Sequence, residues 1–474
     1  GNRPTARLDS MSDIKANNFD HIALEIVAES SPGYLRGQIY DRYGDRTWSA
    51  LSFGESPEPV QNPPAGYVSP FPESDLYPVA ADADTLRDTL VVYSEPAIDR
   101  AMFSPKETGW VTRPTGGVMV NEATVVQADN ALHGEPYALF TAANVPTVAL
   151  TEDERTRYTG LPPDIAPRLV ALAGSIVGDQ SSTLGKINAI TQHFTTNYDY
   201  KIGIQVPRGM DPMTYFLFSE PRPDAHCEYF ATGAALLLRA VDVPTRYVTG
   251  VGVWEQHPFA DYWVGRNRDA HAWVEAWDDV EGWVIVEATP AAGLPEAGQG
   301  QKTNAFRDFW SMITLTVKRF IAALREGAWS AMGGLLRALV VGVAHFFQAA
   351  WWLVLLLIGG GVGLWRLRHW IFRGRSADKA DIDRQRQALN QQLTVMDRWV
   401  RKRRQITRKP HTTIHAFANE IEGLDDEHRD HNTEIAEWYR RWALVRYRGR
   451  PGDTEIRDLE QELRQRLKKS RKRG

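Results

Sequence analysis

Apolar and polar positions alternate in short runs through the N-terminal part of the chain. Between residues 20 and 145 these runs include "HIALEIVAES", "YLRGQIYDRY", "TLVVYSEP" and "ATVVQAD", and clusters of Gly, Pro, Asp and Ser separate them. A period of two residues, bounded by turn-forming residues, is typical of half-buried strands. We therefore predict a β-rich domain over residues 1–148, arranged as an all-β sandwich.

The spacing becomes helical after residue 150. Apolar residues recur three and four positions apart in "PPDIAPRLVALAGSIVG" and in "SSTLGKINAITQHFTTNY", where Ser181, Ser182 and Thr183 offer N-caps. The run "CEYFATGAALLLRAV", which starts at Cys227, favours a nearly fully buried helix because Ala and Leu are strong helix formers.

Three alternating segments rich in Val, Tyr and Trp follow that helix. They read "TRYVTGVGV", "HAWVEAWDD" and "GWVIVEATP", and this pattern predicts consecutive antiparallel strands. The expected fold class of residues 149–295 is therefore α+β, with a cysteine-bearing helix packed on an antiparallel sheet.

The stretch 338–365 carries no Lys, Arg, Asp or Glu. It exceeds the roughly 20 residues that a helix needs to cross a bilayer. A buried core helix is the alternative, but such helices rarely run beyond about 20 residues. We predict a transmembrane helix at 338–365, preceded at 296–337 by a Gly/Gln-rich linker and an amphipathic juxtamembrane segment. A helical, basic domain follows at 366–474.

Charge is distributed unevenly about this stretch. The net charge of −4 combines 28 basic and 17 acidic residues after position 365 with 27 basic and 42 acidic residues before position 338. Arg366, Arg368, Arg373 and Arg375 place the C-terminal side in the cytoplasm by the positive-inside bias. The acidic N-terminal segment is then extracytoplasmic, which in a cell with two membranes means periplasmic, and the protein lies in the inner membrane.

Two further features bear on partners and on export. The runs "RKRR" and "KKSRKR" are interpreted as charged faces near anionic membrane lipid, and we expect no nucleic acid. Residue 1 is Gly and no signal segment precedes the first strands. An exported domain needs such an element, so we expect further membrane segments upstream in a longer protein.

Cys227 is the single cysteine among 474 residues, so no intrachain disulfide can form. A lone cysteine is more often a buried small apolar residue than a nucleophile. However, a thiol at a helix N-terminus beside a histidine has a lowered pKa and becomes a nucleophile. His271 in "DAHAWVEAW" is the best-placed histidine, in a strand expected to pack against the Cys227 helix, and His226 is a secondary candidate.

A third group has to orient the imidazole. Glu287 in "GWVIVEATP" lies one hairpin beyond His271 and could reach it across adjacent strands. Taken singly, His271 also fits a structural histidine and Glu287 a surface charge, so the joint arrangement carries the hypothesis. We expect Asp269 to brace the turn before His271 and Arg246 to pair with a core carboxylate.

The ordered strings "CEYFA", "LLLRAVDVPTRYVTG", "DAHAWVEAW" and "GWVIVEATP" resemble the core of bacterial transglutaminase-like proteins over residues 200–295. The wider layout resembles the membrane-anchored, TgpA-related branch of that superfamily. The resemblance implies a papain-like triad with Cys227 as nucleophile, His271 as general base and acid, and Glu287 as orienting carboxylate. The family more often has Asp at the third position, and a glutamate reaches the imidazole if its strand shifts slightly.

The resemblance implies a membrane-anchored extracytoplasmic enzyme. Its thiolate would attack a protein or peptide carboxamide and transfer the acyl group to an amine or to water. A cysteine protease or amidase, and an inactive envelope binding or scaffold module, are the alternatives. We expect no cofactor and no metal, because no cysteine-rich zinc spacing and no phosphate-binding loop are present. The pattern does not predict an oligomeric state.

Overall fold

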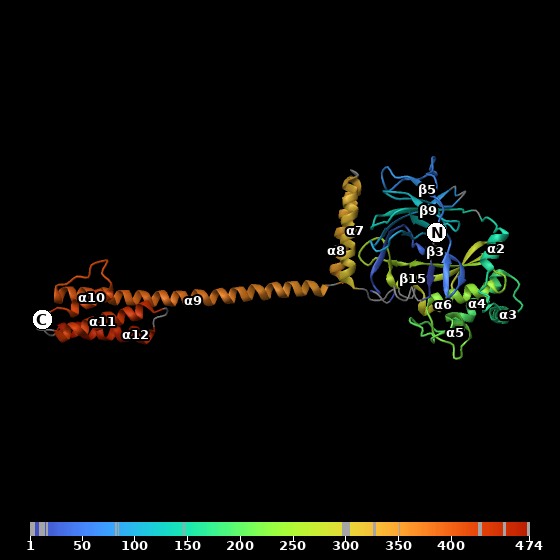
Figure 1. The fold of residues 1–474 in the computed structure, drawn as a ribbon. Helices are drawn as coiled ribbons and strands as arrows, with labels where there is room; N and C mark the ends of the chain where they lie inside the picture. Colours follow the sequence, from blue (N-terminus) through green and yellow to red (C-terminus); the bar gives the residue numbers. More distant parts are fainter. Residues whose placement is uncertain are drawn as a thin grey trace. The chain divides into compact units, whose positions relative to one another are not determined.

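The computed structural model describes residues 5–8, 15, 18–80, 83, 85–145, 147–295, 304–325, 329–349, 351–424, 429–448 and 452–471. The chain divides into two compact units, an N-terminal unit at Gly1–Ala350 and a C-terminal unit at Trp351–Gly474. The predicted linker at 296–303 lies outside the described residues. The fold is α+β, as predicted, with a β-rich N-terminal region, a core of helices on an antiparallel sheet, and a helical C-terminal region (Figure 1).

The described strands of the N-terminal unit form three antiparallel sheets. The first has the order β1-β4-β3-β12-β15-β16 and comprises β1 (Thr5–Arg7), β4 (Thr47–Ala50), β3 (Gly33–Gly44), β12 (Thr245–Val253), β15 (Ala270–Asp278) and β16 (Gly282–Val286). The second has the order β13-β14-β2-β6-β11-β8-β5 and comprises β13 (Glu255–Gln256), β14 (Trp263–Arg266), β2 (Ile22–Val27), β6 (Leu86–Ser94), β11 (Tyr137–Ala142), β8 (Thr108–Thr112) and β5 (Leu76–Pro78). A small sheet joins β7 (Ala101–Met102), β10 (Val126–Ala128) and β9 (Val118–Val120).

Both large sheets combine strands from the two segments that the sequence separates at residue 148. In the first sheet β3 pairs with β12, and in the second β2 pairs with β14. The reason is burial: all nine residues of β12 are buried, so this strand needs covering elements on both faces and a strand partner at each edge. Strand β3 supplies the second edge partner, and it thereby brings residues of the N-terminal segment next to the predicted site.

Helices cover the face of the first sheet that turns away from β5 and β9 (Figure 1). These are α3 (Ala166–Val177), α4 (Thr183–Asn197), α5 (Pro212–Phe218) and α6 (Cys227–Arg239). Helix α2 (Glu152–Thr159) instead packs the ring of Tyr158 against Trp283 of β16. The expected N-cap is present in α4, where the Ser182 hydroxyl accepts the N–H of Gly185. Every residue of α6 is buried, and its apolar side chains pack with Ala272, Val274 and Ala276 of β15. A second core fills the space between the two large sheets.

A helix pair ends the N-terminal unit. Helix α7 (Ala305–Arg325) and helix α8 (Trp329–Ala349) are in contact, with the rings of Phe309 and Phe346 stacked at 4.2 Å. One face of α7 is buried, and Leu315 there packs on Tyr262 and Val264. Residues 331–349 of α8 are apolar and long enough to cross a membrane, by length and composition alone.

The C-terminal unit is helical, as predicted. It contains α9 (Trp351–Arg404), α10 (Ile414–Glu422), α11 (Arg429–Tyr447) and α12 (Asp453–Arg471). The end of α9 packs with the other three helices around one apolar core, which includes Leu389, Phe417, Trp438 and Leu459. The uncharged stretch 338–365 does not form one helix of its own. It covers the end of α8 and the beginning of α9.

Candidate active site

Cys227 is the first residue of α6, as the sequence predicts, and its side chain is buried. His226 is the N-cap residue and makes no side-chain capping bond to the helix. Cys227 therefore lies at the positive end of the helix macrodipole, which favours a negative charge on its thiol. The imidazole of His226 instead lies 3.0 Å from the carboxylate of Glu228, between Nε2 and Oε2, and this pair is also buried.

His271 lies near the start of β15 and is fully buried. Its Nε2 lies 2.6 Å from Oε2 of Glu287, the residue that follows β16. The other ring nitrogen, Nδ1, has no nitrogen or oxygen partner within the described part of the chain, and the thiol of Cys227 interacts with this imidazole. The structure therefore brings together the three residues that the sequence analysis selected.

The charges of the site favour a thiolate–imidazolium pair. Burial alone raises the pKa of the Cys227 thiol, but the positive charges of Lys15, His271 and His226 lower it to about 7. Burial lowers the pKa of His271, yet the carboxylate of Glu287 and the contact with Cys227 raise it to about 9. Between these two values the thiol is ionised while the imidazole is protonated, which is the reactive state of a cysteine nucleophile.

The carboxylate of Glu287 is held by three groups. Oε2 accepts the hydroxyl of Tyr34 at 2.8 Å in addition to the imidazole, and Oε1 accepts the N–H of Thr289 at 2.9 Å. Although burial raises the pKa of Glu287, the charge of His271 and the bonds to Thr289 bring it below its usual value. The longer glutamate side chain is thus fixed in one position beside His271.

Two residues of the site are not apparent from the sequence motifs. Tyr34 comes from β3 and packs against Trp254 and Trp273, with ring centroids at 4.8 and 4.9 Å. Lys15 is buried and donates from Nζ to the hydroxyl of Tyr200 at 3.3 Å. Neither lies in the strings around the triad, and only the pairing of distant segments brings them there.

Two other expectations are confirmed. The guanidinium of Arg246 pairs with the fully buried carboxylate of Glu275, with an Nη2–Oε2 distance of 2.6 Å. The carboxylate of Asp269 accepts the backbone N–H of Arg266 at 2.8 Å and so closes the 3₁₀ turn η1 (Asn267–Asp269) directly before His271. Among the described residues, no group of three or more His, Cys, Asp or Glu side chains is arranged to hold a metal ion.

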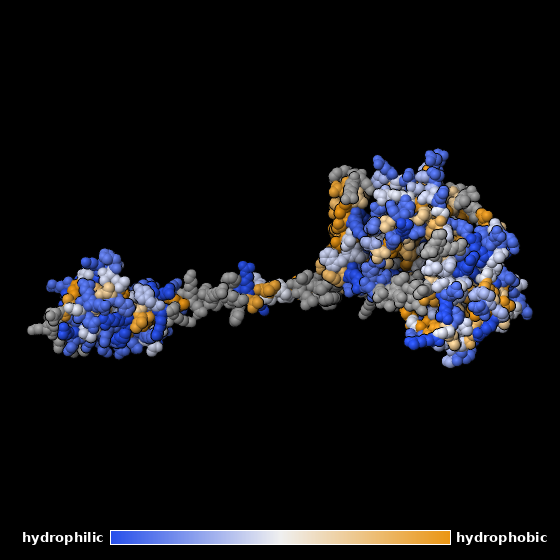
Figure 2. All heavy atoms as spheres, viewed as in Figure 1, coloured by the Kyte–Doolittle hydropathy of each residue, from blue (hydrophilic) through white to orange (hydrophobic). Residues whose placement is uncertain are grey.

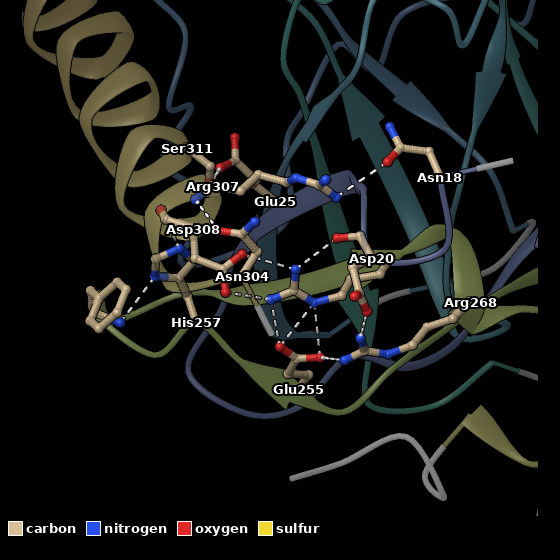
Figure 3. Close-up of polar contacts among 12 residues, drawn as sticks. Asn18, Asp20, Glu25, Glu255, His257, Arg268, Asn304, Arg307, Asp308 and Ser311 are labelled. Carbon is tan, nitrogen blue, oxygen red and sulfur yellow. Dashed lines mark hydrogen bonds and ion pairs between the residues drawn. The ribbon is translucent and has the colours of Figure 1, made fainter. Parts of the chain in front are cut away.

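The turn before His271 is also tied to α7 (Figure 3). Arg266 donates to both carboxylate oxygens of Asp308 at 2.9 and 3.1 Å. Its Nε and Nη2 also donate to the carboxylate of Glu255 at 2.7 to 3.1 Å. The side chains of Arg266 and Asp308 are fully buried. Arg268 adds ion pairs to Glu255 and Asp20. Helix α7 is therefore joined to the segment that carries the predicted base.

Part of the chain is similar to known proteins. Residues 170–288 match the Transglutaminase-like superfamily. A protein-glutamine gamma-glutamyltransferase of Pseudomonas aeruginosa is 32% identical over 151 residues, which are 31% of this chain and 22% of that protein. The uncharacterized protein YebA of Bacillus subtilis is 27% identical over 140 residues, 28% of this chain and 19% of YebA. The chain thus matches about a fifth of the length of these relatives.

Among solved structures, the chain is similar to the periplasmic domain of TgpA from Pseudomonas aeruginosa. The sequence identity is 18% and the TM-score is 0.46, over 61% of this chain and 93% of that domain. The family match includes Cys227, His271 and Glu287, the residues whose geometry is described above. Residues 170–288 of this chain are accordingly a domain of the transglutaminase-like superfamily.

Proposed function

We propose that this chain is a transglutaminase-like cysteine acyltransferase that acts on protein or peptide carboxamides. One observation carries the proposal. Cys227, at the start of α6, lies beside the imidazole of His271, and the Nε2 atom of that imidazole contacts Glu287. The similarity to a protein-glutamine gamma-glutamyltransferase supports an amide donor of the glutamine type.

The reaction begins with the attack of the Cys227 thiolate on the carboxamide carbon. The His271 imidazolium then gives its proton to the departing ammonia, and a thioester forms between the acyl group and the thiol. An incoming amine loses a proton to His271 and displaces the thiol, which yields an isopeptide bond. The backbone N–H of Cys227, at the positive end of the α6 macrodipole, is suited to donate to the oxyanion.

The test measures product masses. The full chain in detergent micelles is incubated with a glutamine-rich protein and a tagged primary amine, alongside Cys227→Ala. We expect tagged product with loss of one ammonia per amine added, and none with Cys227→Ala. Deamidated or cleaved product that depends on Cys227 would instead assign hydrolysis, as in an amidase or a protease. Unmodified substrate at every pH from 6 to 9 would contradict the proposal and favour a binding or scaffold role.

We further propose that the catalytic domain is extracytoplasmic and anchored to the inner membrane. The uncharged stretch 338–365 is proposed to cross the membrane once, and the C-terminal unit to lie in the cytoplasm with its basic residues near anionic lipid. Exposed apolar residues on α7 support a position at the membrane surface: Phe306, Trp310, Val317, Ile321 and Leu324. Figure 2 shows hydrophobic side chains gathered along the α7–α8 pair.

A further inference from the structure

A buried lysine lies at the candidate active site. The side chain of Lys15 is only 4% exposed, although lysine is almost never buried without a partner. Its Nζ donates to the Tyr200 hydroxyl at 3.3 Å, and the two residues are 185 positions apart. No carboxylate of the described residues forms an ion pair with Lys15. Within the described part of the chain, the charge of this ammonium is therefore balanced by groups other than a directly paired acid.

Tyr200 is fixed to the segments on either side of the triad. Its backbone forms a bridge with Ala225, two residues before Cys227, and the N–H of Lys201 donates to the Ala225 carbonyl at 2.7 Å. Its ring packs so closely on Gly293 that a Cβ there would lie 2.1 Å from a ring carbon. Tyr200, whose hydroxyl binds the Lys15 ammonium, is therefore in contact with the segment before α6 and with the segment after Glu287.

Three carboxylates around the candidate active site already have partners. Glu228 contacts His226, and Glu287 contacts His271. Asp269 attracts Lys15, but its carboxylate is bonded to the backbone of Arg266 and lies 3.8 Å from Arg268. The phenol of Tyr200 is neutral at ordinary pH, since burial raises its pKa. Among the described residues, the anion that remains for the Lys15 ammonium is the thiolate of Cys227.

We propose that Lys15 is a thiolate-stabilising residue, whose buried ammonium, held by the Tyr200 hydroxyl, adds a second positive charge to that of His271 at Cys227. This inference rests on the proposed function, because it assigns a role in activating the same nucleophile. The mutual electrostatics agree: Lys15 is the leading cation that lowers the pKa of Cys227, and Cys227 leads the groups that raise the pKa of Lys15 against burial.

The single cysteine makes the test direct. The full chain is alkylated with iodoacetamide at pH values from 5 to 10, and the midpoint of the rate–pH curve reports ionisation of Cys227 without any substrate. We expect a wild-type midpoint near 7. Lys15→Met should move the midpoint upward and slow alkylation at pH 6.5 by about tenfold, with the rate at pH 10 unchanged, because each unit of pKa removes about tenfold of thiolate below the midpoint.

Three variants separate a charge effect from a structural one. Lys15→Arg keeps the charge and should restore the wild-type midpoint. Tyr200→Phe keeps the ring, removes the hydroxyl and should shift the midpoint in the same direction as Lys15→Met. Lys186→Met is the matched control, because that lysine donates to the Val241 carbonyl at 2.8 Å, beyond the far end of α6; it should leave the midpoint unchanged.

The outcomes distinguish this inference from the proposed function. If Lys15→Met has the same midpoint as the unsubstituted protein, the role of Lys15 is overturned and the nucleophile stays intact. If the unsubstituted protein itself has a midpoint of about 8.5, the pKa of an ordinary free thiol, Cys227 is not an activated nucleophile and both proposals fail. If Lys15→Met fails to fold, Tyr200→Phe alone decides: an unchanged midpoint there overturns the inference.

Discussion

At the scale of single residues, the site depends on contacts that join distant parts of the chain. Cys227, His271 and Glu287 were predictable because each belongs to a local string whose pattern fixes its element. Tyr34 and Lys15 were not, since nothing in their own surroundings indicates that β3 would pair with β12 or that Lys15 would meet Tyr200. Short strings therefore predict the reacting groups. The residues that orient these groups or supply charge to them can be predicted only when the pairing of distant segments is known.

Tyr34→Phe tests the support of the third triad residue. The substitution keeps the ring on Trp254 and Trp273 but removes the 2.8 Å hydrogen bond to Glu287. A hydrogen bond to a charged group contributes about 1.5 to 3 kcal/mol, and part of it acts through the orientation of His271. We expect kcat to fall about tenfold with KM nearly unchanged, measured with the glutamine donor and tagged amine.

The matched control for this prediction is Tyr43→Phe. The hydroxyl of Tyr43 is buried and has no hydrogen-bond partner among the described residues, so its removal should leave kcat unchanged. Equal losses of kcat in both variants would mean that the loss does not come from the bond between Tyr34 and Glu287, but from removing a buried hydroxyl in general. An unchanged kcat in Tyr34→Phe would show that Thr289 and His271 suffice to hold the carboxylate.

At the scale of elements, the sequence pattern predicted the helix that begins at Cys227 and the three strands after it, which form the adjacent pairs β12–β15 and β15–β16. It did not predict the other neighbours of these strands. A fully buried strand such as β12 indicates that both of its faces are covered, but not which elements cover them. Register adds a local constraint: Gly250 faces His271, and a Cβ there would lie 2.0 Å from the Leu35 carbonyl.

Helix α7 contributes a buried carboxylate to the turn before His271, and Asp308→Asn tests that contribution. The variant leaves Arg266 buried with one of its two carboxylate partners neutralised. Removing one member of a buried ion pair costs about 3 to 5 kcal/mol. We expect a clear drop in the thermal unfolding midpoint of the N-terminal unit, measured by near-ultraviolet circular dichroism of the full chain.

The adjacent residue supplies the control for that measurement. Arg307 is exposed and donates to Asn18 at 3.2 Å, so Arg307→Gln should change the unfolding free energy by less than about 0.5 kcal/mol. If Asp308→Asn unfolds at the same temperature as Arg307→Gln, the bonds between Arg266 and Asp308 do not hold α7 on the domain.

At the scale of the whole molecule, the charge difference between the segments before and after 338–365 predicts a membrane orientation. Single-cysteine variants can test it. In a Cys227→Ala background, Val280→Cys and Tyr447→Cys place thiols at residues that are 83% and 74% exposed in the two units. With an impermeant maleimide we expect labelling of Val280→Cys in intact spheroplasts, and labelling of Tyr447→Cys only after permeabilisation. Protection of Val280→Cys in spheroplasts would place the candidate active site in the cytoplasm and overturn the proposed anchoring.

The attachment of α7 has a practical consequence for anyone who excises the catalytic domain. A fragment that stops at residue 295 retains the triad but removes Asp308 from Arg266 and uncovers the surface under Leu315. A fragment that stops after Arg325 keeps both, yet it carries the apolar stripe from Phe306 to Leu324 into aqueous buffer. The first fragment should unfold readily and the second should self-associate, so detergent belongs in the preparation of the longer one.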